Sequence, residues 1–226
     1  MTRVVVSPTN VANFPEGGGH FWVYLQYAHA LRSLGCDIVW LERFRGSGDE
    51  DRDAAVLKAF LDLMEPHGLR DRVVLYRCTH GANRIEYLVP NAGEAAARLR
   101  GADLLLNFEY AIAPELLAGF RRSALVDIDP GLLQFWISRG QLQVPAHDVY
   151  FTTGETVGAP GSPIPDCGLV WRRIRPAVSL ELWPFAREPG GDAFTTISSW
   201  WGDEWIRDSD GSHYENNKRV TFLEFA

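Results

Sequence analysis

Short runs of consecutive apolar residues alternate with longer segments of helical periodicity along most of the chain. Strands buried on both faces of a sheet are apolar at consecutive positions, whereas amphipathic helices are apolar at every third or fourth position. The first pattern predicts strands at residues 3–7, 36–41, 72–76, 103–108, 124–128 and 149–153. The second pattern predicts helices at residues 20–34, 53–64, 91–100 and 131–138. The alternation predicts an α/β fold, with a Rossmann-like parallel sheet and helices on both of its faces.

The pattern changes after the last predicted strand, and we expect three segments in the chain. Residues 1–160 form the Rossmann-like domain, and residues 161–192 form a linker, because proline and glycine interrupt every periodicity there. An apolar run at 194–198 and a helical pattern from 218 predict the start of a second α/β domain in residues 193–226. One strand and part of a helix bury too little surface to fold alone. We therefore expect an incomplete second domain, covered by self-association into a homo-oligomer.

Composition and charge narrow the range of partners. The chain has 226 residues and a formal net charge of −7, and its basic residues form no extended patch, which argues against nucleic-acid binding. Three cysteines without a C-x-x-C motif argue against a disulfide scaffold and for a reducing compartment. The N-terminus does not resemble a signal peptide, and no apolar stretch approaches the roughly 20 residues of a membrane helix. We expect a cytoplasmic protein with no membrane span.

The strongest local signal is the loop between the first strand and the first helix, which ends in Gly17, Gly18, Gly19 and His20. Glycines allow a positive φ and a close backbone approach, and a helix N-terminus attracts anions and polar ligands. The contiguous glycines do not match G-x-G-x-x-G, and no Lys-Ser or Lys-Thr pair follows them as in a Walker loop. Two interpretations of His20 stay open: it caps the helix, or it serves as a neutral base at the carboxyl edge of the sheet.

Five further stretches are FPEGGGH at 14–20, AHALRSLGCDIV at 28–39, VDIDPG at 126–131, HDVYFTTGE at 147–155 and FTTISSW at 194–200. The first two resemble the N-terminal, acceptor-side half of GT-B glycosyltransferases, in which Gly-His follows the first strand and a helix leads to a Leu-Gly-x-x-Val strand. The other three resemble a bacterial subgroup of that family. The resemblance runs over most of the chain. It implies a GT-B N-terminal domain followed by a truncated donor-side domain.

The resemblance assigns roles to individual residues. In inverting enzymes of this fold, the histidine matching His20 removes the proton of the acceptor hydroxyl, and a carboxylate from a later strand orients it. Asp127 and Asp129 are the candidate carboxylates, with a slight preference for Asp127 because Pro130 turns the chain directly after Asp129. The alternative for both is a turn and helix cap. Glu109 is a weaker candidate for the same role.

Other residues at the same edge are candidates for substrate contacts. Thr153 and Glu155 follow the sixth strand and could line the cleft, although a helix start explains them equally well. Trp200 could stack on a sugar or base, although packing between domains is the simpler explanation. Together with Gly17, Gly18, Gly19 and Glu109, these form the expected substrate-binding set. His147-Asp148 has no third ligand at suitable spacing, so we expect no metal.

The sequence thus predicts a metal-independent, hexosyltransferase-like enzyme without a cofactor, which transfers a sugar from a nucleotide-sugar donor to a hydroxyl of a small-molecule or glycan acceptor. The donor-binding elements of such enzymes lie in the C-terminal domain, so we expect little or no turnover by this chain alone. The main alternative is a non-catalytic α/β module that binds a glycan or a partner. A Rossmann-type oxidoreductase or epimerase is a further alternative, and the glycine spacing argues against it.

Overall fold

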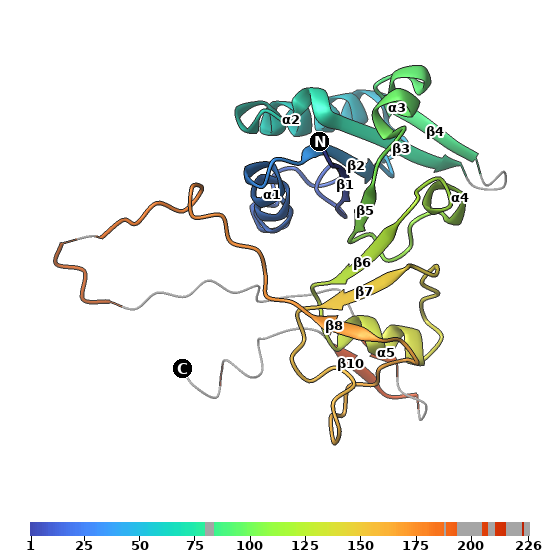
Figure 1. The fold of residues 1–226 in the computed structure, drawn as a ribbon, viewed down its shortest axis with the longest axis vertical. Helices are drawn as coiled ribbons and strands as arrows, with labels where there is room; N and C mark the ends of the chain where they lie inside the picture. The colour runs from blue at the N-terminus through green and yellow to red at the C-terminus, as the bar shows by residue number, and fades with distance from the viewer. Residues whose placement is uncertain (80–83, 188, 194–204, 208–210, 216–222, 224–226) are drawn as a thin grey trace.

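The computed structural model describes residues 1–79, 84–187, 189–193, 205–207, 211–215 and 223. A mixed sheet forms the centre of the molecule (Figure 1). Its strands are β1 (Arg3–Ser7), β2 (Asp37–Arg43), β3 (Val73–Thr79), β4 (Arg84–Val89), β5 (Leu104–Asn107), β6 (Ser123–Asp127), β7 (Val149–Thr152) and β8 (Trp171–Arg173). The α-helices are α1 (Gly18–Ser33), α2 (Glu50–Met64), α3 (Ala92–Leu99), α4 (Pro114–Leu117) and α5 (Leu132–Ser138), with short 3-10 turns at Glu65–His67 and Arg70–Arg72.

The eight strands lie in the order β4-β3-β2-β1-β5-β6-β7-β8. All neighbouring pairs are parallel except β3 and β4, which are antiparallel. The strand order reverses between β1 and β5, because the chain first adds strands on one side of β1 and then continues on the other. In doubly wound folds, a crevice opens beyond the carboxyl ends of the strands at this reversal. The predicted α/β fold with a largely parallel sheet is therefore confirmed, and its strand order is consistent with a Rossmann-like sheet.

Two apolar clusters cover the two faces of the sheet. One joins Val4 and Val6 of β1 to Phe21 of α1 and Phe60 of α2. The other joins Val5 of β1 to buried residues of α3 and α4. Consecutive residues of β1 thus enter opposite clusters, as the alternation of side chains along a strand requires. This two-sided burial is the reason that the strands are apolar at consecutive positions.

All six predicted strands and all four predicted helices are present, with small differences at their ends. Three further elements of the sheet domain, β4, α4 and β8, were not predicted from the sequence. In β4 the more exposed and less exposed residues alternate over its first half, so it lacks the continuous apolar run of a central strand. The four residues of α4 are too few for a periodic pattern, and β8 has three residues that include two exposed arginines.

The segment that follows β8 returns to the outer side of α1. The backbone N–H of Ser179 donates to Gln26 Oε1 at 2.6 Å, and Ser179 Oγ lies 2.8 Å from His29 Nδ1. Further along, the ring of Trp183 packs against Trp22, with a centroid distance of 5.4 Å. This part of the expected linker is therefore hydrogen-bonded to the sheet domain, and β8 extends the sheet into the range 161–192.

The expected second domain falls largely outside the described residues, which include neither the predicted strand at 194–198 nor Trp200. The described part of this range contains β9 (Trp205–Arg207) and β10 (His213–Glu215), which pair antiparallel. β9 contacts α5. The second domain itself stays a prediction. Among the helices in the described part of the chain, none combines the length and hydropathy that crossing a bilayer requires.

Candidate functional site

The carboxyl ends of the parallel strands bring buried polar residues, among them the predicted Asp127, to one edge of the sheet. Ser7 ends β1, Asn107 ends β5, Asp127 ends β6 and Thr152 ends β7, and all four are fully buried. Buried polar groups in such positions need hydrogen-bond partners. The partners of each group decide whether it holds the fold together or is available to a ligand.

His20 is the third residue of α1 and is exposed. Its placement in the first turn of the helix, after the glycines, agrees with the sequence analysis. Gly17 caps the helix at a φ of −80°, and a side chain at Gly17 would collide with the ring of Phe14. A side chain at Gly19 would meet nothing within 4 Å. None of the three glycines has a positive φ, so that part of the expectation is wrong. The expected close approach is present at Gly17, against the ring of Phe14, whereas at Gly19 the absence of a side chain leaves the backbone uncovered.

Asp127 is fully buried and accepts hydrogen bonds on both carboxylate oxygens. Oδ2 accepts from Gln134 Nε2 and from Thr152 Oγ1, each at 2.7 Å. Oδ1 accepts from the backbone N–H of Asp129 at 3.0 Å and from Tyr110 OH at 3.4 Å. Burial raises the pKa of Asp127, and these hydrogen bonds oppose the shift. None of the four donors belongs to His20, so Asp127 joins β6, β7 and α5 instead of orienting the histidine.

Asp129 is exposed and lies two residues further along the same loop. Burial raises the pKa of Tyr24, and the charges of Glu42, Asp129 and Glu109 raise it further. The charge of Asp129 therefore acts on Tyr24, which comes four residues after His20 in α1.

Glu42, at the end of β2, is a buried carboxyl group that the sequence analysis missed. Its Oε1 accepts from the backbone N–H of Ala12 at 2.8 Å, and its Oε2 accepts from Trp40 Nε1 at 2.9 Å. Burial raises its pKa to about 7, while its hydrogen bonds to Trp40, Ala12 and Val11 lower it. Glu42 thus holds the loop between β1 and α1. Its place at the end of an apolar strand was the only signal in the sequence.

Glu109, which follows β5, is 5% exposed and lies near the strand reversal. Its Oε2 accepts from Thr9 Oγ1 at 2.7 Å and lies 3.5 Å from an Nη of Arg45. The side chain of Asn107 fixes its backbone from both sides, because Oδ1 accepts from Glu109 N and Nδ2 donates to Glu109 O. Glu109 therefore links the ends of β1, β2 and β5. Glu109 was predicted as a site residue, but its contacts to Thr9 and Arg45 were not.

His147 supports the same turn from the opposite side. Its Nε2 lies 3.0 Å from Nδ2 of Asn107, and its Nδ1 lies 2.7 Å from the carbonyl oxygen of Pro145. Both contacts fit a neutral ring that donates through Nδ1 and accepts through Nε2. Burial lowers the pKa of His147, which also favours the neutral form. The ring holds Asn107, and through it the backbone of Glu109.

The remaining predicted contacts are more exposed. The backbone N–H of Thr153 donates to the carbonyl of Asp127 at 3.0 Å, which continues the register of β6 and β7. Glu155 is exposed and forms an ion pair with Arg175, which is also exposed. An exposed pair of this kind contributes little to stability. Both residues stay candidates for substrate contacts, and the candidate Trp200 lies outside the described residues.

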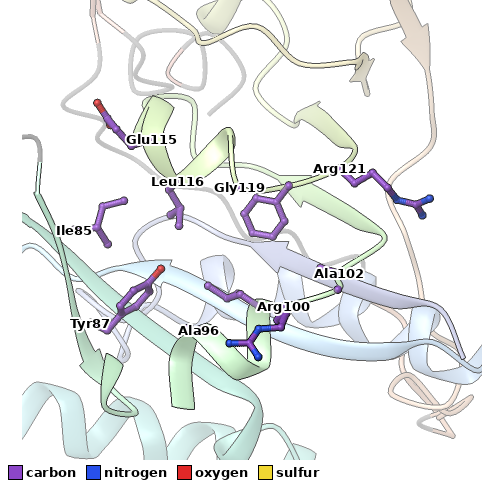
Figure 2. Close-up of a pocket in the computed structure, with 12 residues that line it drawn as sticks. Ile85, Tyr87, Ala96, Arg100, Ala102, Glu115, Leu116, Gly119 and Arg121 are labelled. Atoms are coloured by element: carbon purple, nitrogen blue, oxygen red, sulfur yellow. The ribbon is translucent and has the colours of Figure 1, made fainter. Parts of the chain in front are cut away.

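A separate groove lies between α3 and α4, on the face of the sheet that carries the second apolar cluster (Figure 2). It has a volume of about 500 Å³, and Figure 2 shows Ile85, Tyr87 and Leu116 around it, with Arg121 pointing away. Neither His20 nor Asp129 lines it. The groove forms where the short helix α4 leaves apolar residues of the sheet uncovered, and it is distinct from the carboxyl edge.

Comparison with protein-family models, with curated proteins and with solved structures gives no match for this chain. Within the described residues, no group of three or more His, Cys, Asp or Glu side chains is arranged to hold a metal ion. The function must therefore be argued from the chemistry of the carboxyl edge itself.

Proposed function

We propose that this chain is the acceptor-side half of a GT-B-like glycosyltransferase and that His20 is its general base. The observation that carries the proposal is the exposed His20 ring in the first turn of α1, after an uncovered glycine backbone, at the carboxyl edge beside the strand reversal. Ligands of open α/β sheets bind at that edge. The resemblance in sequence around the glycines supports the same assignment.

The chemistry needs one proton acceptor. A ring nitrogen of His20 takes the proton of the acceptor hydroxyl, and the oxygen forms a bond to the anomeric carbon of the donor sugar. The bond from that carbon to the diphosphate oxygen breaks, and the nucleoside diphosphate leaves with the electron pair. The first turn of α1 carries no acidic residue that would pair with the ring, and an imidazole nitrogen without its proton can act as a general base.

Asp129 is the positioning residue in this proposal. Asp127, the slightly preferred candidate from the sequence, has both oxygens occupied by hydrogen bonds within the fold. Asp129 is exposed, and its charge acts on Tyr24, which comes four residues after His20 in α1. A carboxylate there stabilises the imidazolium that forms during transfer and orients the ring.

A non-catalytic binding module is the second candidate, and the exposed aromatic residues near α1 favour it. Trp22 and Trp183 are 38% and 54% exposed, and they contact each other. Aromatic rings with one open face are suited to stacking against a sugar or a partner surface. This candidate predicts glycan binding that depends on Trp22 and does not depend on His20.

The two candidates are separated by a transfer assay with the His20→Gln variant. The chain is incubated for a long period with a set of nucleotide sugars and glycan acceptors, and the product is detected by mass spectrometry, because we expect slow turnover. Loss of the base lowers the rate about 100-fold or more, and Asp129→Asn lowers it about tenfold. Since Asp129 acts through the ring, its variant also shifts the pH profile of the rate.

His29→Gln is the matched control, because it removes another histidine of the same helix that contacts Ser179. It should leave the rate within about twofold of the wild type. Equal transfer rates for the wild type and His20→Gln would reject His20 as the general base. Glycan binding without transfer, lost in Trp22→Ala and kept in His20→Gln, would establish the binding module instead.

A further inference from the structure

One edge of the sheet is formed by β4, which has a single neighbouring strand, β3, among the described residues. Figure 1 shows β4 at the outer border of the sheet. The backbone N–H and C=O groups on the outer side of an edge strand lack a ladder partner, so they can pair with a strand of another chain. Whether a chain docks there depends on the side chains of the strand and on the space beside it.

Two hollows meet at β4. The larger is the groove of about 500 Å³ between α3 and α4, and Ile85 and Tyr87 lie at one end of it (Figure 2). A second hollow of about 340 Å³ is lined by the four consecutive residues 84–87 and by Ala92. Consecutive side chains of a strand point to opposite faces, so a hollow lined by four of them follows the edge of the strand. The first half of β4 therefore borders open space.

The side chains in this half of β4 alternate between charged and apolar. Ile85 and Tyr87 are half-buried and pack against the second apolar cluster, on the face that carries the groove. Arg84 and Glu86 are exposed and lie on the opposite face. The pairing with β3 is regular from residue 84 to residue 87 and shifts only beyond it. Residues 84–87 thus form a regular stretch that another strand can join.

The two charges of this stretch select one register for a pair of identical strands. Side chains directly opposite each other in an antiparallel pair share a face, and like charges in such positions repel. A two-fold pair centred on Arg84 or on Glu86 sets that residue opposite its own copy, so it is disfavoured. A pair centred on Ile85 instead sets Arg84 of each copy opposite Glu86 of the other, which gives two attractive pairs. The edge of β4 is thus complementary in charge to itself.

We propose that β4 is the docking edge for a second copy of this chain, which pairs antiparallel with it about a two-fold axis at Ile85. The two sheets then form one continuous sheet, and Ile85 of the second copy lies beside Ile85 at the end of the groove. Closed two-fold pairs are the commonest form of homo-oligomer. Pairing over a few residues buries little surface, so the dimer is transient, with a Kd on the order of 10 μM.

The test is analytical ultracentrifugation of the whole chain between about 1 and 200 μM, a range that brackets the expected Kd. The mass should rise from that of a monomer toward that of a dimer. Glu86→Arg and Arg84→Glu each turn both cross-strand pairs repulsive and should weaken dimerisation about tenfold or more. The double variant Arg84→Glu/Glu86→Arg restores opposite charges and should dimerise within about threefold of the wild type. Glu181→Arg, an exposed residue beside α1, is the charge-matched control and should dimerise as the wild type does.

Amide hydrogen exchange gives a second readout, at the level of the backbone. The outward N–H groups of residues 84–86 join a ladder only in the dimer, so they should exchange about fivefold more slowly at the highest protein concentration than at the lowest. The amides of β6, in the interior of the sheet, should not depend on concentration. In Glu86→Arg the exchange at residues 84–86 should be the same at both concentrations. This readout separates pairing at β4 from a change in charge alone.

The proposal is overturned if the wild type stays monomeric over the whole range, if the single variants associate as the wild type does, or if the double variant fails to associate. Association that persists in both single variants would place the contact elsewhere, such as in residues 193–226, for which the sequence predicts self-association. His20→Gln should dimerise as the wild type does, so a failure of the transferase proposal and a failure of the dimer proposal give different results.

Discussion

Buried polar side chains occur both on β6 and β7 and on β1 and β3, but their hydrogen bonding differs. At the ends of β6 and β7, Asp127 accepts from four donors, and Thr152 both donates to Asp127 and accepts from Gly154 N. On β1 and β3, the hydroxyl groups of Ser7 and Tyr76 are equally buried but have no hydrogen-bond partner within the described structure.

The difference separates a hydrogen-bonded polar cluster from buried polar groups that have no partner among the described residues. A satisfied network fixes the loops that it joins, and further hydrogen bonding to it gains little. An unsatisfied group lowers the stability of the free protein, and a ligand that pairs with it recovers that free energy. The sign of a stability change on deleting a hydroxyl therefore distinguishes the two pairs of strands.

The largest expected effect comes from removing the Asp127 carboxylate, which holds the hydrogen-bonded cluster on β6 and β7 together. Asp127→Ala leaves buried donors on Gln134 and Thr152 without a partner, and it should lower the free energy of unfolding by about 4 kcal/mol. Urea denaturation measures the change. Asp129→Ala removes an exposed carboxylate from the same loop and should cost about 1 kcal/mol or less. Equal losses in the two variants would contradict the structural role of Asp127.

The second effect is a pH dependence that originates from Glu42. Burial raises its pKa in the folded protein to about 7, above its ordinary value of 4.5. Its contribution to stability is therefore fully present below the unfolded pKa and is lost as the pH rises through the folded pKa. The free energy of unfolding should fall by about 3 kcal/mol between pH 4.5 and pH 8 because of this group.

Glu42→Gln should remove this part of the pH dependence, although the amide loses one of the two hydrogen bonds at every pH. Glu50→Gln, an exposed residue of α2, serves as the control and should keep the wild-type slope. Urea unfolding at several pH values gives the comparison. If the free energy of unfolding of Glu42→Gln changed with pH as steeply as that of the wild type, the Glu42 carboxyl group would not be the source of the pH dependence.

The smallest effect compares one hydroxyl from each pair of strands. Thr152→Val keeps the side-chain shape and removes the hydroxyl between Asp127 and Gly154, so it should destabilise the fold by about 2 kcal/mol. Ser7→Ala removes a hydroxyl without a partner and should leave the stability unchanged or raise it by up to about 1 kcal/mol. Losses of the same size would remove the distinction between the two pairs of strands.

Much of the fold could be predicted because central strands and long helices have patterns that depend on local periodicity. The six central strands and four helices all appear in the structure. The edge strands β4 and β8 and the helix α4 could not be predicted in this way, because they are short or partly exposed and bury little apolar surface. Their formation depends on the neighbours that they meet in the folded sheet.

The candidate site was predictable only in part. The position of His20 followed from the order of strand, glycines and helix. The choice between Asp127 and Asp129 did not, because both end the same strand and only the folded loop shows which carboxylate is enclosed. Glu42 was missed for a related reason, since its partner Ala12 is 30 residues away in the chain.

The sequence by itself determined the alternation of strands and helices, and with it the sheet edge at which the polar residues gather. Periodicity acts over a few residues, so it is visible in the chain before any contact is known. Only the tertiary structure decided which of those polar residues have partners. Hydrogen bonds such as those of Asp127 and Glu109 join residues from separate strands, and no local pattern encodes whether their donors and acceptors will meet.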